Sequence, residues 1–138
     1  MDKEQIKKDL GNGAIFDIGE KNPFGEFFDG QSYLKMLTTK GVSIANVTFE
    51  RGCRNHWHRH ISGGQILLCT GGRGYYQKWG EPARELLPGD IVEIGEEKHW
   101  HGAAPDSCFC HIAIEIPGEN AKTQWLEPVD AEQYSKLK

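Results

Sequence analysis

HWHRHISGGQ, residues 56–65, places His56, His58 and His60 at alternate positions and follows them with Gln65. In an extended strand alternate residues share one face, so the three imidazoles should project together. Imidazole nitrogens suit divalent transition metals, and strands hold such ligands more rigidly than loops do. The stretch therefore predicts a strand that carries metal ligands.

The other three histidines lie in two further segments with strand character. His99 and His101 flank Trp100, and His111 lies within FCHIAIEI at 109–116. A single histidine would most readily be a buried side chain that makes ordinary hydrogen bonds. Six histidines confined to three such segments indicate a shared role, because strands that line one barrel bring their inward side chains together.

Short strand patterns recur along the chain and are separated by turns that contain glycine or proline. They are QSYLKMLTT (31–39), VSIANVTFE (42–50), GQILLCT (64–70), RGYYQKW (73–79), DIVEIG (90–95) and FCHIAIEI (109–116). Helical periodicity is confined to the two ends, at 2–10 and 129–138. The pattern predicts an all-β barrel or sandwich with short terminal helices, and periodicity alone does not separate these two architectures.

Length and composition narrow the class of protein further. A chain of 138 residues predicts one domain over 1–138, with the core barrel at about 31–117. The formal net charge is −4, with no block of like charges, which argues against a nucleic-acid partner. The charged N-terminus and short apolar runs argue against a secretory signal and a membrane partner. We therefore expect a cytoplasmic protein with a small-molecule substrate and four reduced cysteines.

The spacing of these residues resembles the motifs of the cupin family. The first cupin motif begins G-x5-H-x-H-x3,4-E and ends on a glycine. Gly52, His58 and His60 match it, Gln65 replaces the acid, and a glycine follows at Gly71. The second motif is approximated by GDIVEIGEEKH at 89–99, which has glycine where a proline is common. The resemblance implies the double-stranded β-helix, or jelly-roll barrel, of cupins.

A narrower resemblance joins four segments of the chain: FERGCRNHWHRH (49–60), GQ (64–65), KHWHGAAP (98–105) and HIAI (111–114). Together they are similar to the small bacterial cupins that include the manganese-dependent hydroxynitrile lyases. The similarity runs from about residue 25 to residue 134. The loop between the second histidine and the glutamine is one residue longer here than in those lyases, which bears on the shape of the pocket.

The resemblance implies a set of site residues. The metal ligands would be His58, His60, Gln65 and His99, and His56 would lie beside them without binding the metal. The substrate pocket would include Ala45, Val47 and Gln77, while His101 and His111 would act as general acid or base or would orient a ligand. The metal would be divalent, with manganese first and iron, nickel or zinc as alternatives.

The expected ligand set also bears on the reaction. Three neutral imidazoles and a carboxamide leave the 2+ charge of the metal uncompensated, which makes the site a good host for anions. This favours lyase or isomerase chemistry over oxygen activation, and the resemblance to the hydroxynitrile lyases favours a lyase reaction on a carbon–carbon bond. Another cupin activity, such as that of a dioxygenase or isomerase, remains open, as do a non-enzymatic binding module and a metal-free structural cupin. Cupins commonly form homodimers or larger homo-oligomers, and residues 31–39 would form the intersubunit sheet.

Overall fold

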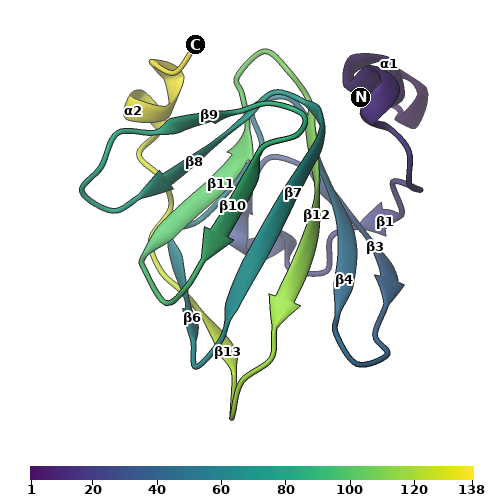
Figure 1. Ribbon diagram of the computed structural model, residues 1–138. Coiled ribbons are helices and arrows are strands. Elements are labelled where there is room, and N and C mark those ends of the chain that lie inside the picture. Colours follow the sequence, from purple (N-terminus) through teal and green to yellow (C-terminus); the bar gives the residue numbers. More distant parts are fainter.

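Two curled β-sheets enclose one interior in the computed structural model, which describes residues 1–138 (Figure 1). The first sheet has the order β1-β3-β4-β12-β7-β10. Its strands are β1 (Glu20–Lys21), β3 (Ser32–Thr38), β4 (Ile44–Phe49), β12 (Phe109–Ile116), β7 (Gly64–Gly72) and β10 (Ile91–Ile94). All of its pairings are antiparallel. The predicted all-β fold is confirmed.

The second sheet is centred on β11, which pairs with β6 and β5 on one side and with β8 on the other. Its strands are β13 (Lys122–Trp125), β6 (His58–Ile61), β11 (His99–Ala103), β5 (Arg54–Asn55), β2 (Phe28–Asp29), β8 (Gly74–Lys78) and β9 (Arg84–Leu86). Gly102 of β11 lies against β5, where an added Cβ would come within 2.5 Å of the Cα of Arg54. The two strands can approach this closely because residue 102 has no side chain.

The stretch at 56–65 is divided between the two sheets. His56 precedes β6, a turn at Ser62 and Gly63 follows this strand, and β7 of the other sheet then begins. The expectation that His56 shares a strand face with His58 and His60 is therefore wrong. The backbone N–H of His56 donates to the Phe27 carbonyl at 2.9 Å, so this residue belongs to the connection between β5 and β6.

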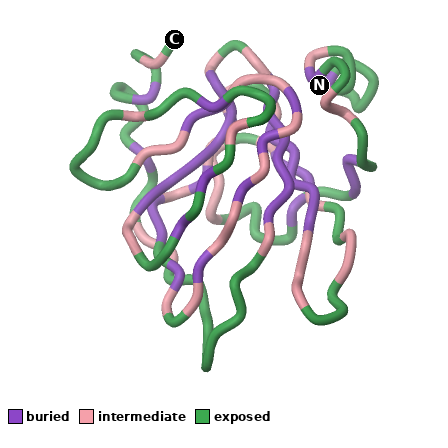
Figure 2. The backbone as a smooth tube through the Cα atoms, in the orientation of Figure 1, coloured by how far each residue is buried: buried purple, intermediate pink, exposed green.

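The interior is apolar at one end and histidine-lined at the other. Inward side chains of both sheets, including Phe49, Leu67, Leu86 and Phe109, form the main buried cluster. Figure 2 shows buried residues along all of β11 and the first part of β12, alternating buried and intermediate residues along β7, and exposed tips where strands connect. The ring centroid of Phe49 lies 5.5 Å from that of His111, so the apolar cluster forms the floor beneath the histidines.

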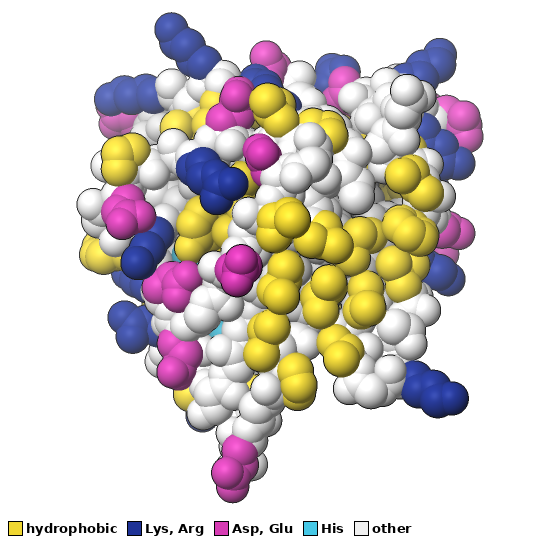
Figure 3. Space-filling view, viewed as in Figure 1, with side chains coloured by type: hydrophobic (Ala, Val, Ile, Leu, Met, Phe, Trp, Pro, Cys, Tyr) yellow, Lys and Arg dark blue, Asp and Glu magenta, His cyan; other side chains and the backbone are white.

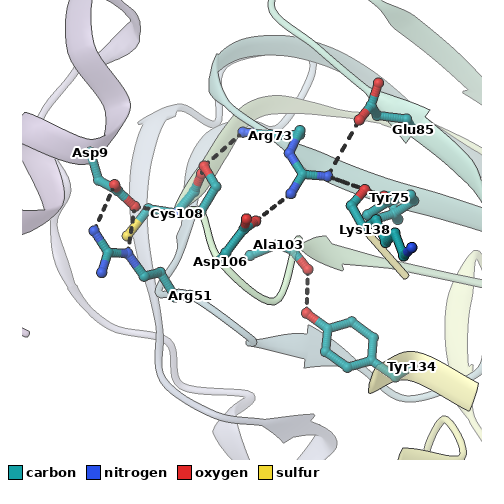
Figure 4. Close-up of polar contacts among 11 residues, drawn as sticks. Asp9, Arg51, Arg73, Tyr75, Glu85, Ala103, Asp106, Cys108, Tyr134 and Lys138 are labelled. Carbon is teal, nitrogen blue, oxygen red and sulfur yellow. Dashed lines mark hydrogen bonds and ion pairs between the residues drawn. The ribbon is translucent and has the colours of Figure 1, made fainter. Parts of the chain in front are cut away.

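Two terminal helices are fastened to the outside of the barrel by polar contacts (Figure 4). In α1 (Lys3–Leu10), Asp9 accepts hydrogen bonds from Arg51 at 2.9 and 3.1 Å and from the Cys108 backbone at 2.5 Å. The guanidinium of Arg51 holds the pKa of Asp9 down at about 2. In α2 (Ala131–Ser135), the Tyr134 hydroxyl donates to the Ala103 carbonyl of β11 at 2.5 Å. Two short 3-10 turns, η1 (Gly11–Gly13) and η2 (Gly25–Phe27), complete the elements.

None of the helices is long and apolar enough to cross a membrane. Strand β3, at the predicted intersubunit position, pairs within its own chain with β4 along its length and with β1 at Tyr33 and Leu34. Only the end of β3 at 35–38 keeps a free edge. Strand addition from a second copy would be restricted to this short end.

Candidate metal centre

Three histidines meet where β6 and β11 run side by side. His58 and His99 are directly opposite each other in the antiparallel register, and His60 lies two residues further along β6. All three are buried, and one potential ligand nitrogen from each lies within 4.8 Å of the others. Alternation along β6 turns both of its histidines inward and leaves Arg59 exposed. The sequence-predicted triad is thus brought together, whereas the imidazole of His56 lies outside it.

Backbone carbonyls fix the orientation of two of these rings. The Nδ1 of His58 lies 2.8 Å from the His56 carbonyl, and the Nδ1 of His99 lies 2.8 Å from the Glu97 carbonyl. Because a carbonyl oxygen accepts, each Nδ1 carries the proton and each Nε2 keeps its lone pair. His56 thereby contributes through its backbone, and its ring lies 4.0 Å from an Asp29 carboxylate oxygen.

Burial keeps the triad neutral near pH 7. It lowers the pKa of His99 to about 4 and also lowers the pKa of His60. The pKa of His58 lies well below its usual value because of burial and because of the neighbouring His99. Neutral imidazoles with free lone pairs are the form that binds a metal ion.

Gln65 presents its amide oxygen without a partner. Its Nε2 donates to the Glu115 carboxylate at 2.5 Å, while its Oε1 is buried and accepts no hydrogen bond. The two residues are direct partners in the register of β7 and β12. Because the amide nitrogen is held by the carboxylate, the oxygen is the end that remains for the cavity that both residues line.

The donors present fit a divalent metal. The Nε2 atoms of His60 and His99 are buried without hydrogen-bond partners, and so is the Oε1 of Gln65. Buried polar atoms left unpaired are costly, so two such nitrogens within one cluster of histidines, with a further unpaired oxygen on the wall of the adjoining cavity, indicate a missing ligand. Nitrogen donors with one oxygen donor suit manganese, iron, nickel and zinc alike, and therefore do not identify the metal.

A cavity of about 370 Å³ opens beside the triad. Ala45 and Val47 line it as short side chains of β4, and His58, His60 and Gln65 line it from β6 and β7. Its wall is otherwise formed by aromatic, aliphatic and polar side chains. These are Asn22, Phe24, Phe28, Leu34, Met36, Ser43, Asn55, His101, His111, Ala113, Glu115, Thr123 and Trp125.

Gln77 does not line this cavity. It is the register partner of Trp100 and accepts a 2.8 Å hydrogen bond from the indole nitrogen of that residue. Trp100 alternates with His99 and His101 along β11, so both Trp100 and Gln77 face the outside of the sheet. There Trp100 packs in a cluster with Trp57.

His101 and His111 form a second, deeper histidine pair that is joined to Asn55. The Asn55 oxygen accepts from the His101 backbone N–H at 2.9 Å, so the Asn55 amide nitrogen is the group that faces His101 Nε2 at 3.2 Å. His101 Nε2 must then accept, and its Nδ1 donates to His111 Nε2 at 3.3 Å. The chain of donors runs from Asn55 through His101 to His111, whose own Nδ1 is left without a partner.

Asn55 and Glu115 were not among the residues predicted from the sequence. Glu115 follows His111 and Ala113 at alternate positions of β12, so the same two-residue period that selects His111 also selects Glu115. Asn55 carried no such pattern, because β5 contains only two residues. Its partner is 46 positions away in the sequence.

Comparison with known proteins gives two relatives with the same level of identity. An (R)-mandelonitrile lyase of Granulicella tundricola is 44% identical over 96 residues, which cover 69% of this chain and 72% of the lyase. The crystal structure of a cupin-like protein from Thermotoga maritima is 44% identical and has a TM-score of 0.82. That match covers 89% of this chain and 96% of the other.

More distant structures share the fold only. The DMSP lyase DddQ of Ruegeria pomeroyi matches with a TM-score of 0.59 at 18% identity, over 78% of this chain and 55% of the other. No family model matches the sequence. The barrel, the three clustered histidines and the two relatives at 44% identity agree with the resemblance found in the sequence. This chain belongs to the cupin family.

Proposed function

We propose that this cupin is a divalent-metal-dependent lyase that cleaves and forms a carbon–carbon bond of small cyanohydrins. The observation that carries the proposal is the set of partnerless donor atoms on His60, His99 and Gln65 beside a largely apolar cavity. The similarity to an (R)-mandelonitrile lyase supports the reaction class. Manganese is the metal we propose first, with iron, nickel and zinc as alternatives.

His58, His60, His99 and Gln65 would hold the metal. When bound, a divalent cation supplies Lewis acidity, which stabilises negative charge that develops on a substrate. The four protein donors are neutral, and the Glu115 carboxylate accepts a hydrogen bond from the amide nitrogen of Gln65 at 2.5 Å. That carboxylate polarises the amide, so the amide oxygen becomes a stronger donor without adding an anionic ligand.

The cavity would bind a small substrate with one apolar end. Phe24, Phe28 and Trp125 supply aromatic surface, and Ala45 and Val47 leave room near the triad because their side chains are short. A cavity of about 370 Å³ lies at the small end of the usual range for ligand pockets. Burial of an aromatic ring against these walls would orient the polar carbon of the substrate toward the histidines.

Cleavage of a cyanohydrin removes the hydroxyl proton and breaks the bond between the carbinol carbon and the nitrile carbon. The products are an aldehyde and hydrogen cyanide, so the hydroxyl proton needs a transient acceptor. We assign this role to His101 Nε2, which borders the cavity and which only the Asn55 amide approaches, at 3.2 Å. A substrate hydroxyl that replaces the amide donor would transfer its proton there, and His111 would accept a hydrogen bond from the resulting imidazolium. The imidazolium would then return this proton to the departing cyanide, which leaves as hydrogen cyanide.

The test measures metal content and turnover on the same samples. Protein reconstituted separately with manganese, iron, nickel and zinc is analysed by mass spectrometry, and (R)-mandelonitrile cleavage is followed through the release of benzaldehyde. We expect about one equivalent of metal and metal-dependent release, both lost in the His58→Ala/His99→Ala double variant. Metal binding without turnover would reject the lyase in favour of a binding module, and no metal binding would reject the metal site itself.

A further inference from the structure

Glu115 is the one charged side chain on the wall of the cavity beside the triad. Four histidines also line this cavity, and burial lowers the pKa of each of them, so they are neutral near pH 7. Glu115 is exposed, and it borders an adjoining cavity of about 330 Å³ together with His60 and Thr123. The carboxylate therefore lies where the interior meets solvent, at the mouth of the candidate site.

No cation neutralises this carboxylate. Glu115 takes part in no ion pair, and it accepts its hydrogen bond from the neutral amide of Gln65 at 2.5 Å. On the outside of the sheet, Figure 3 shows hydrophobic side chains gathered over β7, β12 and β4. The neighbours of the pair along its two strands are uncharged as well: Gly64, Ile66, Ile114 and Ile116. The negative charge is thus left to act on a ligand that approaches the mouth.

The charge matters because the proposed metal site would otherwise attract anions. Neutral donors leave a divalent cation with its full charge, and such a cation favours a carboxylate over an uncharged ligand of the same shape. A carboxylate at the mouth opposes this preference by repelling the anion as it enters. Glu115 is engaged with the amide nitrogen of Gln65, so the neutral amide oxygen is the donor left for the metal. Lewis acidity is kept at the reacting atoms while anions are repelled on the way in.

We propose that Glu115 restricts this site to uncharged substrates and excludes carboxylates of the same size, such as 2-hydroxy acids. The proposal rests on the lyase function above, and it fits that reaction because the cyanohydrin, the aldehyde and hydrogen cyanide are all uncharged. Specificity of this kind arises when the wrong ligand is made unfavourable, without any new contact to the right one. Glu115 is then a specificity-determining residue in addition to holding the amide of Gln65.

Mandelate and mandelamide are matched probes of this selection, because they have nearly the same shape and differ by one negative charge. Their affinities for manganese-loaded protein are measured by isothermal titration calorimetry, and mass spectrometry checks that every sample is fully loaded. The pH is set to 8, because burial raises the pKa of the Glu115 carboxyl group. We expect Glu115→Gln to bind mandelate about tenfold more tightly than the parent does, and mandelamide to within about threefold of the parent.

Three results of these titrations would overturn the proposal: unchanged mandelate affinity in Glu115→Gln, an equal gain for both probes, or no binding of either probe to either protein. Turnover of (R)-mandelonitrile is measured separately on the same samples. A parent that shows the expected shift between the probes but does not cleave the cyanohydrin would reject the lyase and support the selection against anions.

Lys122 offers a matched control of opposite charge. It lines the adjoining cavity with Glu115, it is exposed, and it takes part in no ion pair. Lys122→Met should therefore weaken mandelate binding, by about twofold to threefold, and leave mandelamide unchanged. A gain in mandelate affinity in this variant would contradict an electrostatic effect at the mouth.

Salt separates repulsion at the mouth from an effect that passes through the metal. The gain in Glu115→Gln should shrink as salt is raised from about 0.02 M to about 0.5 M, because exposed charges are screened. A gain that does not depend on salt would show that the substitution acts through the amide of Gln65 on the metal, and it would overturn the proposal.

Discussion

His99 and His101 lie two residues apart on one strand and both are buried, but their ring nitrogens make different hydrogen bonds. The Nε2 of His99 has no partner, whereas His101 has both ring nitrogens engaged, one with Asn55 and one with His111. Burial depresses the pKa of both. The difference teaches that burial alone does not mark a candidate metal ligand; a ring nitrogen that is left unpaired close to other donors does.

The largest effect is expected when one imidazole ring of the triad is removed. We expect His99→Ala to weaken metal binding by more than about 100-fold, because three donors on two strands no longer converge. His56→Ala is the matched control, since it keeps the backbone carbonyl that orients His58. Both are measured by competition with a metal chelator, and equal metal loss in the two variants would contradict the assignment of the triad.

His111 of the deeper pair should affect how the free energy of unfolding depends on pH. Burial lowers the pKa of His111 to about 3, so between pH 6.5 and pH 3 only the unfolded chain takes up a proton at this residue. As the pH is lowered, the free energy of unfolding should therefore fall by about 1.4 kcal/mol for each pH unit because of His111 alone. Between pH 6.5 and pH 5 the fall should be about 2 kcal/mol. This part of the slope should be absent in His111→Gln.

The pH dependence is measured by urea unfolding of metal-free protein at several pH values. His111→Gln will lower stability at all pH values because it disturbs a packed interior, so the slope and not the absolute value is compared. An unchanged slope between pH 6.5 and pH 5 would show that His111 does not remain neutral in the folded protein.

A smaller effect is expected from the residue that orients the fourth donor. Glu115→Gln replaces a carboxylate by a neutral acceptor, so the amide oxygen of Gln65 becomes a weaker donor. We expect metal affinity to fall about tenfold while the fold is retained. Glu119→Gln, on an exposed connection, gives the control, and isothermal titration with manganese compares the two. Unchanged affinity for Glu115→Gln would remove Gln65 from the ligand set.

The smallest effect on metal affinity should come from reversing the hydrogen-bond chain in the deeper pair, because Asn55 bonds to His101 and to none of the proposed ligands. Asn55→Asp presents an acceptor in place of the amide donor, so His101 should move its proton from Nδ1 to Nε2. Stability should fall, because the variant places an ionisable carboxylate where Asn55 is 2% exposed, so the tautomer and not the stability is the quantity compared. Nitrogen-15 NMR of the imidazoles reads the tautomer directly. A parent protein that already carries the proton on His101 Nε2 would contradict the direction of the chain.

The sequence by itself was sufficient for the class of fold and, through its resemblance to the cupins, for the three histidines that converge. Alternation along β6 and β11 turns His58, His60 and His99 inward in any arrangement that buries the apolar face of each strand. The glycine-rich turns and short apolar runs fixed an all-β fold in the same local way. These features depend on neighbours in the chain, so they can be deduced without tertiary contacts.

Other features were decided only by how the strands meet. A register shift between β7 and β12, at Cys110 and His111, leaves one residue of β7 unpaired and brings Glu115 opposite Gln65. Without that shift, alternation would be displaced by one residue and the pair would separate. Gln77 is placed outside the barrel by its pairing with Trp100, and Asn55 meets His101 across 46 residues. Such contacts follow from register and turns between distant segments, which no local pattern encodes.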